Sequence, residues 1–145
     1  MNAAEPPHDR SWALIFACWL VASASTLGAL FLSEVMGLAP CVLCWYQRIC
    51  MFPLVFILPA GLFPFDPKIV RYALPLSLAG WVIAMFHQLL AAGYIPDSVK
   101  PCTQGVPCTD VQIVWFGFVT IPLLSLLAFT LVNALLILAH TKSPK

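Results

Sequence analysis

Residues 12–32, WALIFACWLVASASTLGALFL, form an apolar stretch in which no charged side chain occurs between Ser11 and Ser33. At a helical rise of ~1.5 Å per residue, about 20 residues cross the ~30 Å hydrocarbon layer of a bilayer. Ala22-Ser23-Ala24 resembles a leader cleavage site, but the apolar stretch continues beyond it to Leu32. We therefore expect an uncleaved membrane-spanning helix.

Three further apolar runs follow, at about residues 45–63, 72–92 and 113–139. Arg48, near the start of the second run, is the one charged residue within them. Because lipid offers backbone groups no hydrogen-bond partners, helices rather than open strands span a membrane. The sequence predicts a single all-α domain over residues 1–145, a four-transmembrane-helix bundle.

Composition supports this class. The chain is 61% apolar and only 9% charged, and its mean hydropathy is +0.94, whereas soluble domains are about one quarter charged. A formal net charge of +1 gives no basis for binding nucleic acid, which requires clustered basic residues. We expect no nucleic-acid partner.

Basic residues predict the orientation of the bundle. Four spans place both termini and the connection at 64–71 on one side of the membrane. That side holds five of the basic residues, Arg10, Lys68, Arg71, Lys142 and Lys145. The loops at about 33–44 and 93–112 hold only Lys100. By the positive-inside rule, both termini are cytoplasmic and the two loops face outward.

The two outward loops contain four of the six cysteines. Cys41 and Cys44 have Cys-x-x-Cys spacing, and Cys102 and Cys108 lie within PCTQGVPC. Disulfides persist outside the cytoplasm, so two structural staples are one interpretation. A Cys-x-x-Cys ring, however, constrains an unfolded chain very little and is more often reducible and redox-active.

Zinc is a competing interpretation of the four cysteines. Structural zinc sites pair cysteines with two to four intervening residues, whereas five residues separate Cys102 from Cys108. Thiols in an oxidising compartment also tend to be consumed. We therefore expect no metal.

Arg48 places a positive charge close to the first cysteine pair. Pro40 suits a chain about to enter a helix, so Cys41 and Cys44 are expected near a helix N-terminus, where free N–H groups favour a thiolate. Arg48 follows Cys44 by four residues and shares its helical face. At ~6 Å, its charge would favour a thiolate by about 2–3 kcal/mol. The guanidinium could also hold an oxygen that becomes anionic on reduction, or extend to lipid phosphates.

The pattern Pro40-Cys41-x-Leu43-Cys44-x-x-Gln47-Arg48, with four apolar spans and a second cysteine pair, resembles the bacterial disulfide-bond-formation protein B (DsbB) family. PCTQGVPC and FGFVTIPLLS at 116–125 resemble its compact BdbC-like branch. The resemblance implies a thiol:quinone oxidoreductase of the bacterial inner membrane that supports disulfide formation in exported proteins. Its active-site loops would face the periplasm, and its acceptor would be ubiquinone or menaquinone from the membrane quinone pool.

The resemblance also implies a role for each cysteine. A soluble periplasmic thioredoxin-fold protein of the DsbA type attacks the Cys102–Cys108 disulfide and forms a mixed disulfide with Cys102. Cys108 is then exchanged onto Cys41, and Cys44 beside Arg48 passes the electrons to quinone and restores the Cys41–Cys44 disulfide. The better-known branch has a longer second loop, so the order of exchange is left open.

Two polar residues in the spans have alternative roles. His87 lies ~7 Å below the outer end of the third span, near the depth expected for Arg48. His87 and Gln47 could hydrogen-bond a quinone carbonyl, or they could bridge neighbouring helices. The alternative for the whole chain is a non-enzymatic four-span protein whose loops are only stapled by disulfides.

Overall fold

The computed structural model describes residues 7–96, 99, 101, 106–108, 114–115 and 119–142. The four long helices are α1 (Pro7–Leu30), α2 (Val42–Leu62), α3 (Val70–Ala91) and α4 (Ile121–Lys142). A π-helical turn, η1 (Phe31–Val35), extends α1, and a 3₁₀ turn, η2 (Pro67–Ile69), precedes α3. Four helices are long and apolar enough to cross a membrane, which confirms the predicted fold class.

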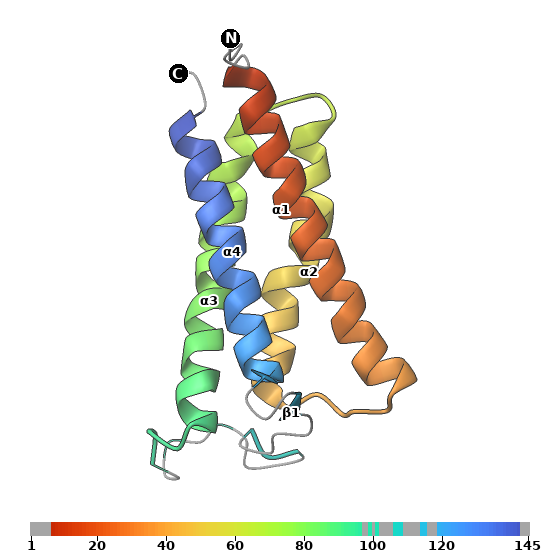
Figure 1. Cartoon of the computed structure of the whole chain (residues 1–145), viewed down its shortest axis with the longest axis vertical. Helices are drawn as coiled ribbons and strands as arrows, with labels where there is room; N and C mark the ends of the chain where they lie inside the picture. Colours follow the sequence, from red (N-terminus) through yellow and green to blue (C-terminus); the bar gives the residue numbers. More distant parts are fainter. Residues whose placement is uncertain are drawn as a thin grey trace.

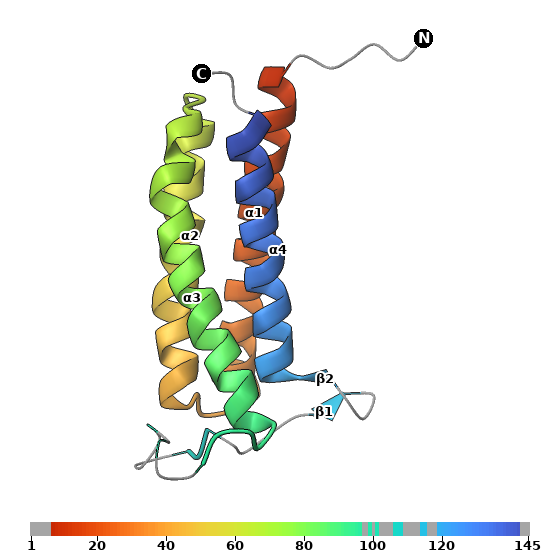
Figure 2. The same cartoon turned by 90° about the vertical axis from the view of Figure 1, so that its left-hand side faces the viewer.

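The helices form an up-and-down bundle. Helix α1 packs on α2 and α4, and α3 packs on the same two neighbours. The start of α1, the end of α4 and the connection between α2 and α3 lie at one end of the bundle (Figures 1 and 2). The turn between α1 and α2 and the described residues between α3 and α4 lie at the other end. The compartment that each end faces stays a prediction.

The start of the fourth span was predicted wrongly. Helix α4 begins at Ile121 and not near residue 113. Before it, β1 (Val114–Trp115) and β2 (Val119–Thr120) pair antiparallel. The cause is local. Thr120 Oγ1 accepts a hydrogen bond from the Leu123 N–H at 3.3 Å, which caps the start of a helix. Pro122 suits the first turn, because it has no backbone N–H that would need a partner there.

A backbone carbonyl released by a proline links two of the helices. Pro59 lies inside α2 and has no N–H, so the carbonyl of Val55, four residues earlier, loses its usual partner. The indole Nε1–H of Trp19 on α1 donates to this carbonyl at 3.1 Å. The proline therefore places an interhelical hydrogen bond where lipid could supply none.

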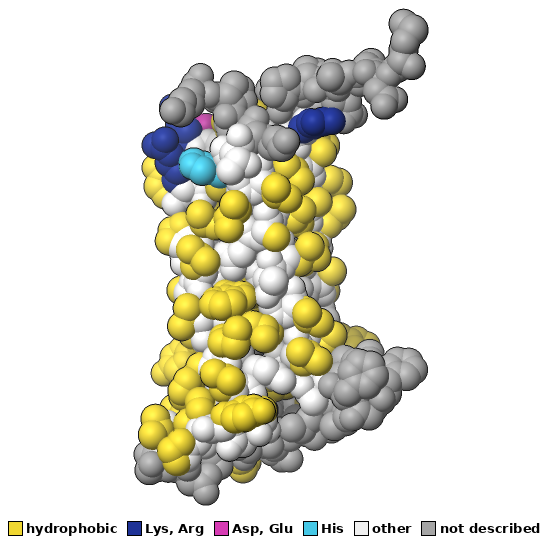
Figure 3. Space-filling view, turned by 60° about the vertical axis from the view of Figure 1, so that its left-hand side comes forward, with side chains coloured by type: hydrophobic (Ala, Val, Ile, Leu, Met, Phe, Trp, Pro, Cys, Tyr) yellow, Lys and Arg dark blue, Asp and Glu magenta, His cyan; other side chains and the backbone are white. Residues whose placement is uncertain are grey.

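On the face shown in Figure 3, apolar side chains cover the middle of the bundle, and Lys and Arg side chains lie at one end. Arg10, Lys68 and Arg71 are exposed at the end where the chain of helices begins and finishes. Large apolar side chains such as Leu27 and Phe56 are 67% and 79% exposed along the helices. Such a surface suits lipid rather than water.

Candidate functional site

The Cys-x-x-Cys pair lies at the start of α2. Cys41 is the residue before the helix, and its Sγ accepts a hydrogen bond from the Cys44 N–H at 3.4 Å, as a serine hydroxyl does at a typical helix start. The two cysteines are free thiols in this structure, and their Sγ atoms share a hydrogen bond of 3.2 Å. The pair is therefore described in its dithiol form, with the sulfurs already adjacent.

Cys41 is the more acidic partner. When Cys41 is deprotonated, the Cys44 thiol donates a hydrogen bond to it, and this lowers the pKa of Cys41 from 9.0 to about 4. Hydrogen bonding to His87 and the Cys44 N–H acts in the same direction, while burial opposes it. A thiolate is the form that attacks disulfides, so these hydrogen bonds activate Cys41.

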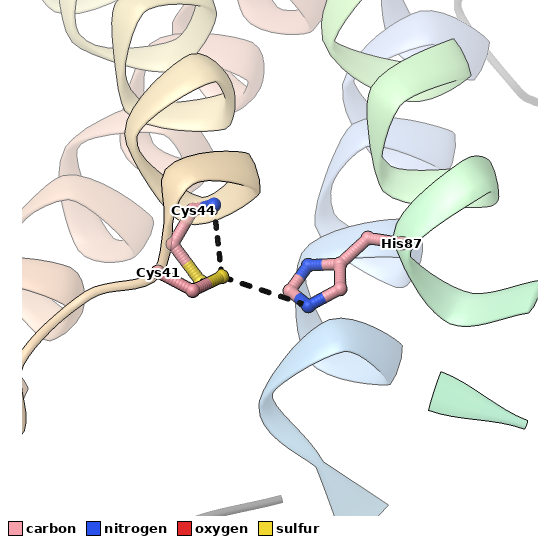
Figure 4. A group of neighbouring side chains, drawn as sticks. All are labelled: Cys41, Cys44 and His87. Atoms are coloured by element: carbon pink, nitrogen blue, oxygen red, sulfur yellow. Dashed lines mark hydrogen bonds between the residues drawn. The ribbon is translucent and has the colours of Figure 1, made fainter. Parts of the chain in front are cut away.

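His87 on α3 faces this pair (Figure 4). Its Nε2 lies 3.8 Å from Cys41 Sγ and 3.2 Å from the carbonyl oxygen of Cys108. The side chain is buried, with 3% of its surface exposed. His87 therefore lies between the first cysteine pair and a cysteine of the second loop.

Gln47 holds the other side of the imidazole. Its Nε2 lies 3.1 Å from His87 Nδ1, and its Oε1 accepts a hydrogen bond of 2.6 Å from the hydroxyl of Ser125 on α4. This chain of hydrogen bonds joins α2, α3 and α4, so the bridging alternative considered from the sequence is present in the structure. Binding of quinone by His87 and Gln47 stays a prediction.

Arg48 connects α2 to α1. Its Nη2 donates to the carbonyl oxygen of Ala29 at 2.8 Å, and its Nη1 donates to the Ser33 hydroxyl at 3.3 Å. The guanidinium also lies over the Trp45 ring, 5.4 Å from its centroid. Since a guanidinium has five N–H donors, these two bonds leave donors for a ligand.

A cavity of about 470 Å³ opens beside these residues. Arg48, both cysteines of the pair and the side chains of Gln47 and His87 line it, together with apolar residues of α1 and α4. Figure 1 shows the C-terminal part of α1 leaning away from α2 and α4 on this side. The volume and the mostly apolar lining are typical of a site for a small organic ligand.

The second cysteine pair is described in part. Cys108 is buried and disulfide-bonded, and it packs in one cluster with Cys41, Leu43 and Leu90. Its predicted partner, Cys102, lies outside the described residues. Cys108 therefore adjoins Cys41, whereas the exchange between them that the resemblance implies stays a prediction.

Three parts of the site were missed from the sequence: the Ala29 carbonyl, the Ser33 hydroxyl and the Ser125 hydroxyl. Ser125 carried a usable signal, because a polar side chain inside an apolar span usually has a partner. A backbone carbonyl such as that of Ala29 carries no sequence signal. It becomes a partner only because of how α1 lies against α2.

The four spans and the sulfur groups gathered at one end define a multi-pass membrane protein with a thiol–disulfide site. Residues 9–139 match the family model of Disulfide bond formation protein DsbB, and the chain belongs to this family. The chain is 46% identical over 138 residues to "Probable disulfide formation protein" of Metapseudomonas resinovorans, with 94% of this chain and 96% of the relative covered. It is 45% identical over 118 residues to "Disulfide bond formation protein C" of Bacillus subtilis, with 81% and 86% covered. No solved structure matches the chain.

These matches confirm the resemblance to the DsbB family and to its compact BdbC-like branch. The family gives the chain a role in disulfide bond formation. The geometry of the site indicates how its own residues serve that role.

Proposed function

We propose that the chain is a membrane thiol:quinone oxidoreductase that reoxidises a soluble thioredoxin-fold protein of the DsbA type. The observation that carries the proposal is the position of the Cys41–Cys44 pair at the wall of the 470 Å³ cavity. The cavity is lined by apolar residues of α1, α2 and α4 and by the guanidinium of Arg48. A dithiol, a cation and a lipid-side cavity are the parts that transfer of electrons from thiols to a membrane-soluble acceptor requires.

The residues present fit a quinone. Ala24, Gly28 and Phe129 offer an apolar wall to the ring and its tail, and Arg48 offers donors to a carbonyl oxygen. A bound quinone, ubiquinone or menaquinone, supplies an acceptor for two electrons and two protons. Arg48 would favour the anionic charge that develops on that oxygen, because its own charge is held in place by α1.

The second pair would connect this site to the soluble partner. The partner's dithiol reduces the Cys102–Cys108 disulfide by way of a mixed disulfide with Cys102, and the partner leaves oxidised. The two thiols then reduce the Cys41–Cys44 disulfide by exchange of Cys108 with Cys41. Both steps conserve two electrons and two protons, which finally leave through the Cys41–Cys44 pair to the acceptor.

The packing of Cys108 against Cys41 supports this exchange in a short loop. The longer loop of the better-known branch is unnecessary when the two residues already share a cluster. His87 Nε2 lies next to Cys41 Sγ and the Cys108 carbonyl, so it can hold a proton where the thiolate forms.

The proposed setting is the bacterial inner membrane, with the cysteine-bearing end of the bundle facing the periplasm. The basic residues at the opposite end support this orientation. In this arrangement a water-borne partner reaches Cys102 while a lipid-borne acceptor reaches the cavity.

Turnover of a cysteine variant tests the proposal. The purified full-length chain, given quinone and a reduced DsbA-type protein, should oxidise that protein, and Cys44→Ser should lower the rate to background because no disulfide can re-form. Cys50→Ala is the matched control, since Cys50 is a buried free thiol on α2 outside the cavity. Its rate should stay near that of the parent. Full turnover by Cys44→Ser would contradict the assigned mechanism.

A further inference from the structure

Three groups that ligate soft metals converge at the start of α2. The ligating atoms of Cys41, Cys44 and His87 all lie within 4.8 Å of one another (Figure 4). We propose that the dithiol form of this site binds a soft divalent cation, of the zinc or cadmium type, through two sulfurs and His87 Nε2. This set differs from the four-cysteine zinc site considered from the sequence, because the histidine takes the place of the second pair.

Two of the three separations between these ligand atoms are close to those of a tetrahedral site, and the third is within 4.8 Å. With Zn–S and Zn–N bonds of ~2.3 and ~2.0 Å, tetrahedral ligands are ~3.8 Å apart for two sulfurs and ~3.6 Å apart for sulfur and nitrogen. Here the two Sγ atoms are 3.2 Å apart, and Cys41 Sγ is 3.8 Å from His87 Nε2. Widening the sulfur pair by about 0.6 Å needs only small side-chain rotations.

The surroundings of His87 suit a metal ligand. A histidine that binds metal through one nitrogen usually gives its other N–H to a fixed acceptor. The Gln47 amide already contacts His87 Nδ1 at 3.1 Å, and turning that amide would present its oxygen to an Nδ1–H. Ser125 can follow, because a hydroxyl both donates and accepts.

Charge and ligand type favour a soft cation. Two thiolates and a divalent cation form a neutral complex, so burial costs little, and the two thiol protons are released as the metal binds. No carboxylate is found among the described residues that line the cavity. Sulfur and imidazole ligands select zinc-like ions over calcium or magnesium.

A bound cation would hold the pair reduced. Oxidation to a disulfide needs both sulfurs, and the metal occupies both. The inference goes beyond the proposed function because it depends only on the dithiol geometry and not on the identity of the electron acceptor or of the soluble partner.

Cadmium binding tests the inference directly. The full-length chain carrying Cys102→Ser and Cys108→Ser would be reduced, and the reductant would be removed under anaerobic conditions. The protein would then be titrated with Cd²⁺ while the cadmium–thiolate absorbance is followed. One ion per chain is expected in the dithiol form and none after oxidation to the disulfide. Competition with a chelator for Zn²⁺ then gives the affinity.

Variants assign the ligands. His87→Ala should weaken Zn²⁺ binding at least about tenfold, and Gln47→Leu should weaken it by about tenfold through loss of support. Cys50→Ala should bind as the parent does, because Cys50 is outside the cavity. Circular dichroism identifies any variant that does not fold. If His87→Ala does not fold, Gln47→Leu serves in its place.

Two results would overturn the inference: no saturable one-to-one binding by the dithiol form, or unchanged affinity in folded His87→Ala and Gln47→Leu. Neither experiment contains quinone or partner. Failure here would therefore leave the thiol:quinone proposal intact. Full turnover by Cys44→Ser, which would contradict that proposal, would leave this one intact.

Discussion

Cys41 has two roles, as the capping residue of α2 and as a reactive thiol. At most helix starts the capping atom is a side-chain oxygen. Its sulfur caps α2 by accepting from the Cys44 N–H, and the same sulfur is the reactive atom. Capping places the sulfur at the positive end of the helix dipole, which favours negative charge there. The Cys44 thiol and His87 add hydrogen bonds from two further directions. The Cys44 thiol is the largest cause of the low pKa of Cys41, and the N–H at the helix start adds to it.

The pH dependence of alkylation should report this activation. Because hydrogen bonding lowers the pKa of Cys41 to about 4, its thiolate persists at neutral pH and is lost only as pH falls through that value. The rate of reaction of Cys41 with iodoacetamide in the dithiol form should be nearly flat from pH ~5.5 to 9. An ordinary thiol loses about tenfold per unit below its pKa.

Cys44→Ala provides the matched comparison for this measurement. Removing the donor should raise the pKa of Cys41 and move the midpoint of the profile to higher pH, as peptide mass spectrometry of the alkylated residue would show. A parent profile with its midpoint near 9 would contradict the assigned acidity. An unmoved midpoint in the variant would remove Cys44 as its cause.

Some of these residues were predictable and some were not. The spacing of Cys44 and Arg48 predicts a common helical face, and both residues line the cavity. The partners of His87 were not fixed by spacing, because Gln47 lies 40 residues away in the sequence. Periodicity predicts which face a residue occupies, whereas contacts between helices depend on how the helices pack.

The helices show the same division between local and tertiary information. Apolar length predicted four spans, and all four are present. The prediction joined residues 113–120 to the fourth span because apolar length does not separate a helix from a short hairpin. The sequence did carry a signal for strands here, because β-branched and aromatic residues favour strands. These residues are Val114, Trp115, Val119 and Thr120.

Close packing of α3 on α4 depends on Gly80. A Cβ at this position would overlap the ring of Phe129 and approach the Cβ of Cys50. Gly80→Ala should therefore destabilise the bundle by about 1–3 kcal/mol through overpacking. Thermal unfolding in detergent, followed by circular dichroism, measures the effect.

Gly28 supplies the control for this substitution. Nothing lies within 4 Å of a Cβ built there, so Gly28→Ala should cause no loss of stability. Phe129→Leu combined with Gly80→Ala should recover part of the lost stability, since the smaller side chain relieves the overlap. Equal stability of the parent and Gly80→Ala would show that this contact does not limit the packing.

The bundle as a whole separates two environments. The Cys41–Cys44 pair, His87 and Cys108 lie at one end of the bundle, and the exposed basic residues Arg10, Lys68 and Arg71 lie at the other. Residues of α1, α2 and α4 line the cavity beside the Cys41–Cys44 pair. The proposed function requires that a soluble partner and a membrane-soluble acceptor approach these cysteines from different directions.

Labelling of single cysteines tests the orientation that this separation requires. Tyr94, beyond the end of α3, is 80% exposed, and Lys68 at the opposite end is also exposed. A membrane-impermeant maleimide should label Tyr94→Cys in intact cells and Lys68→Cys only after lysis. The reverse pattern would place the site in the cytoplasm and contradict the proposed setting.

The stoichiometry of quinone reduction tests the central claim most directly. The purified chain is mixed with a reduced DsbA-type protein and an excess of quinone, and oxygen is excluded. One quinone should be reduced for every two partner thiols lost. Quinone absorbance measures the first quantity and thiol titration the second. Arg48→Met should slow this reaction without changing the ratio. Loss of partner thiols without quinone reduction would contradict the account.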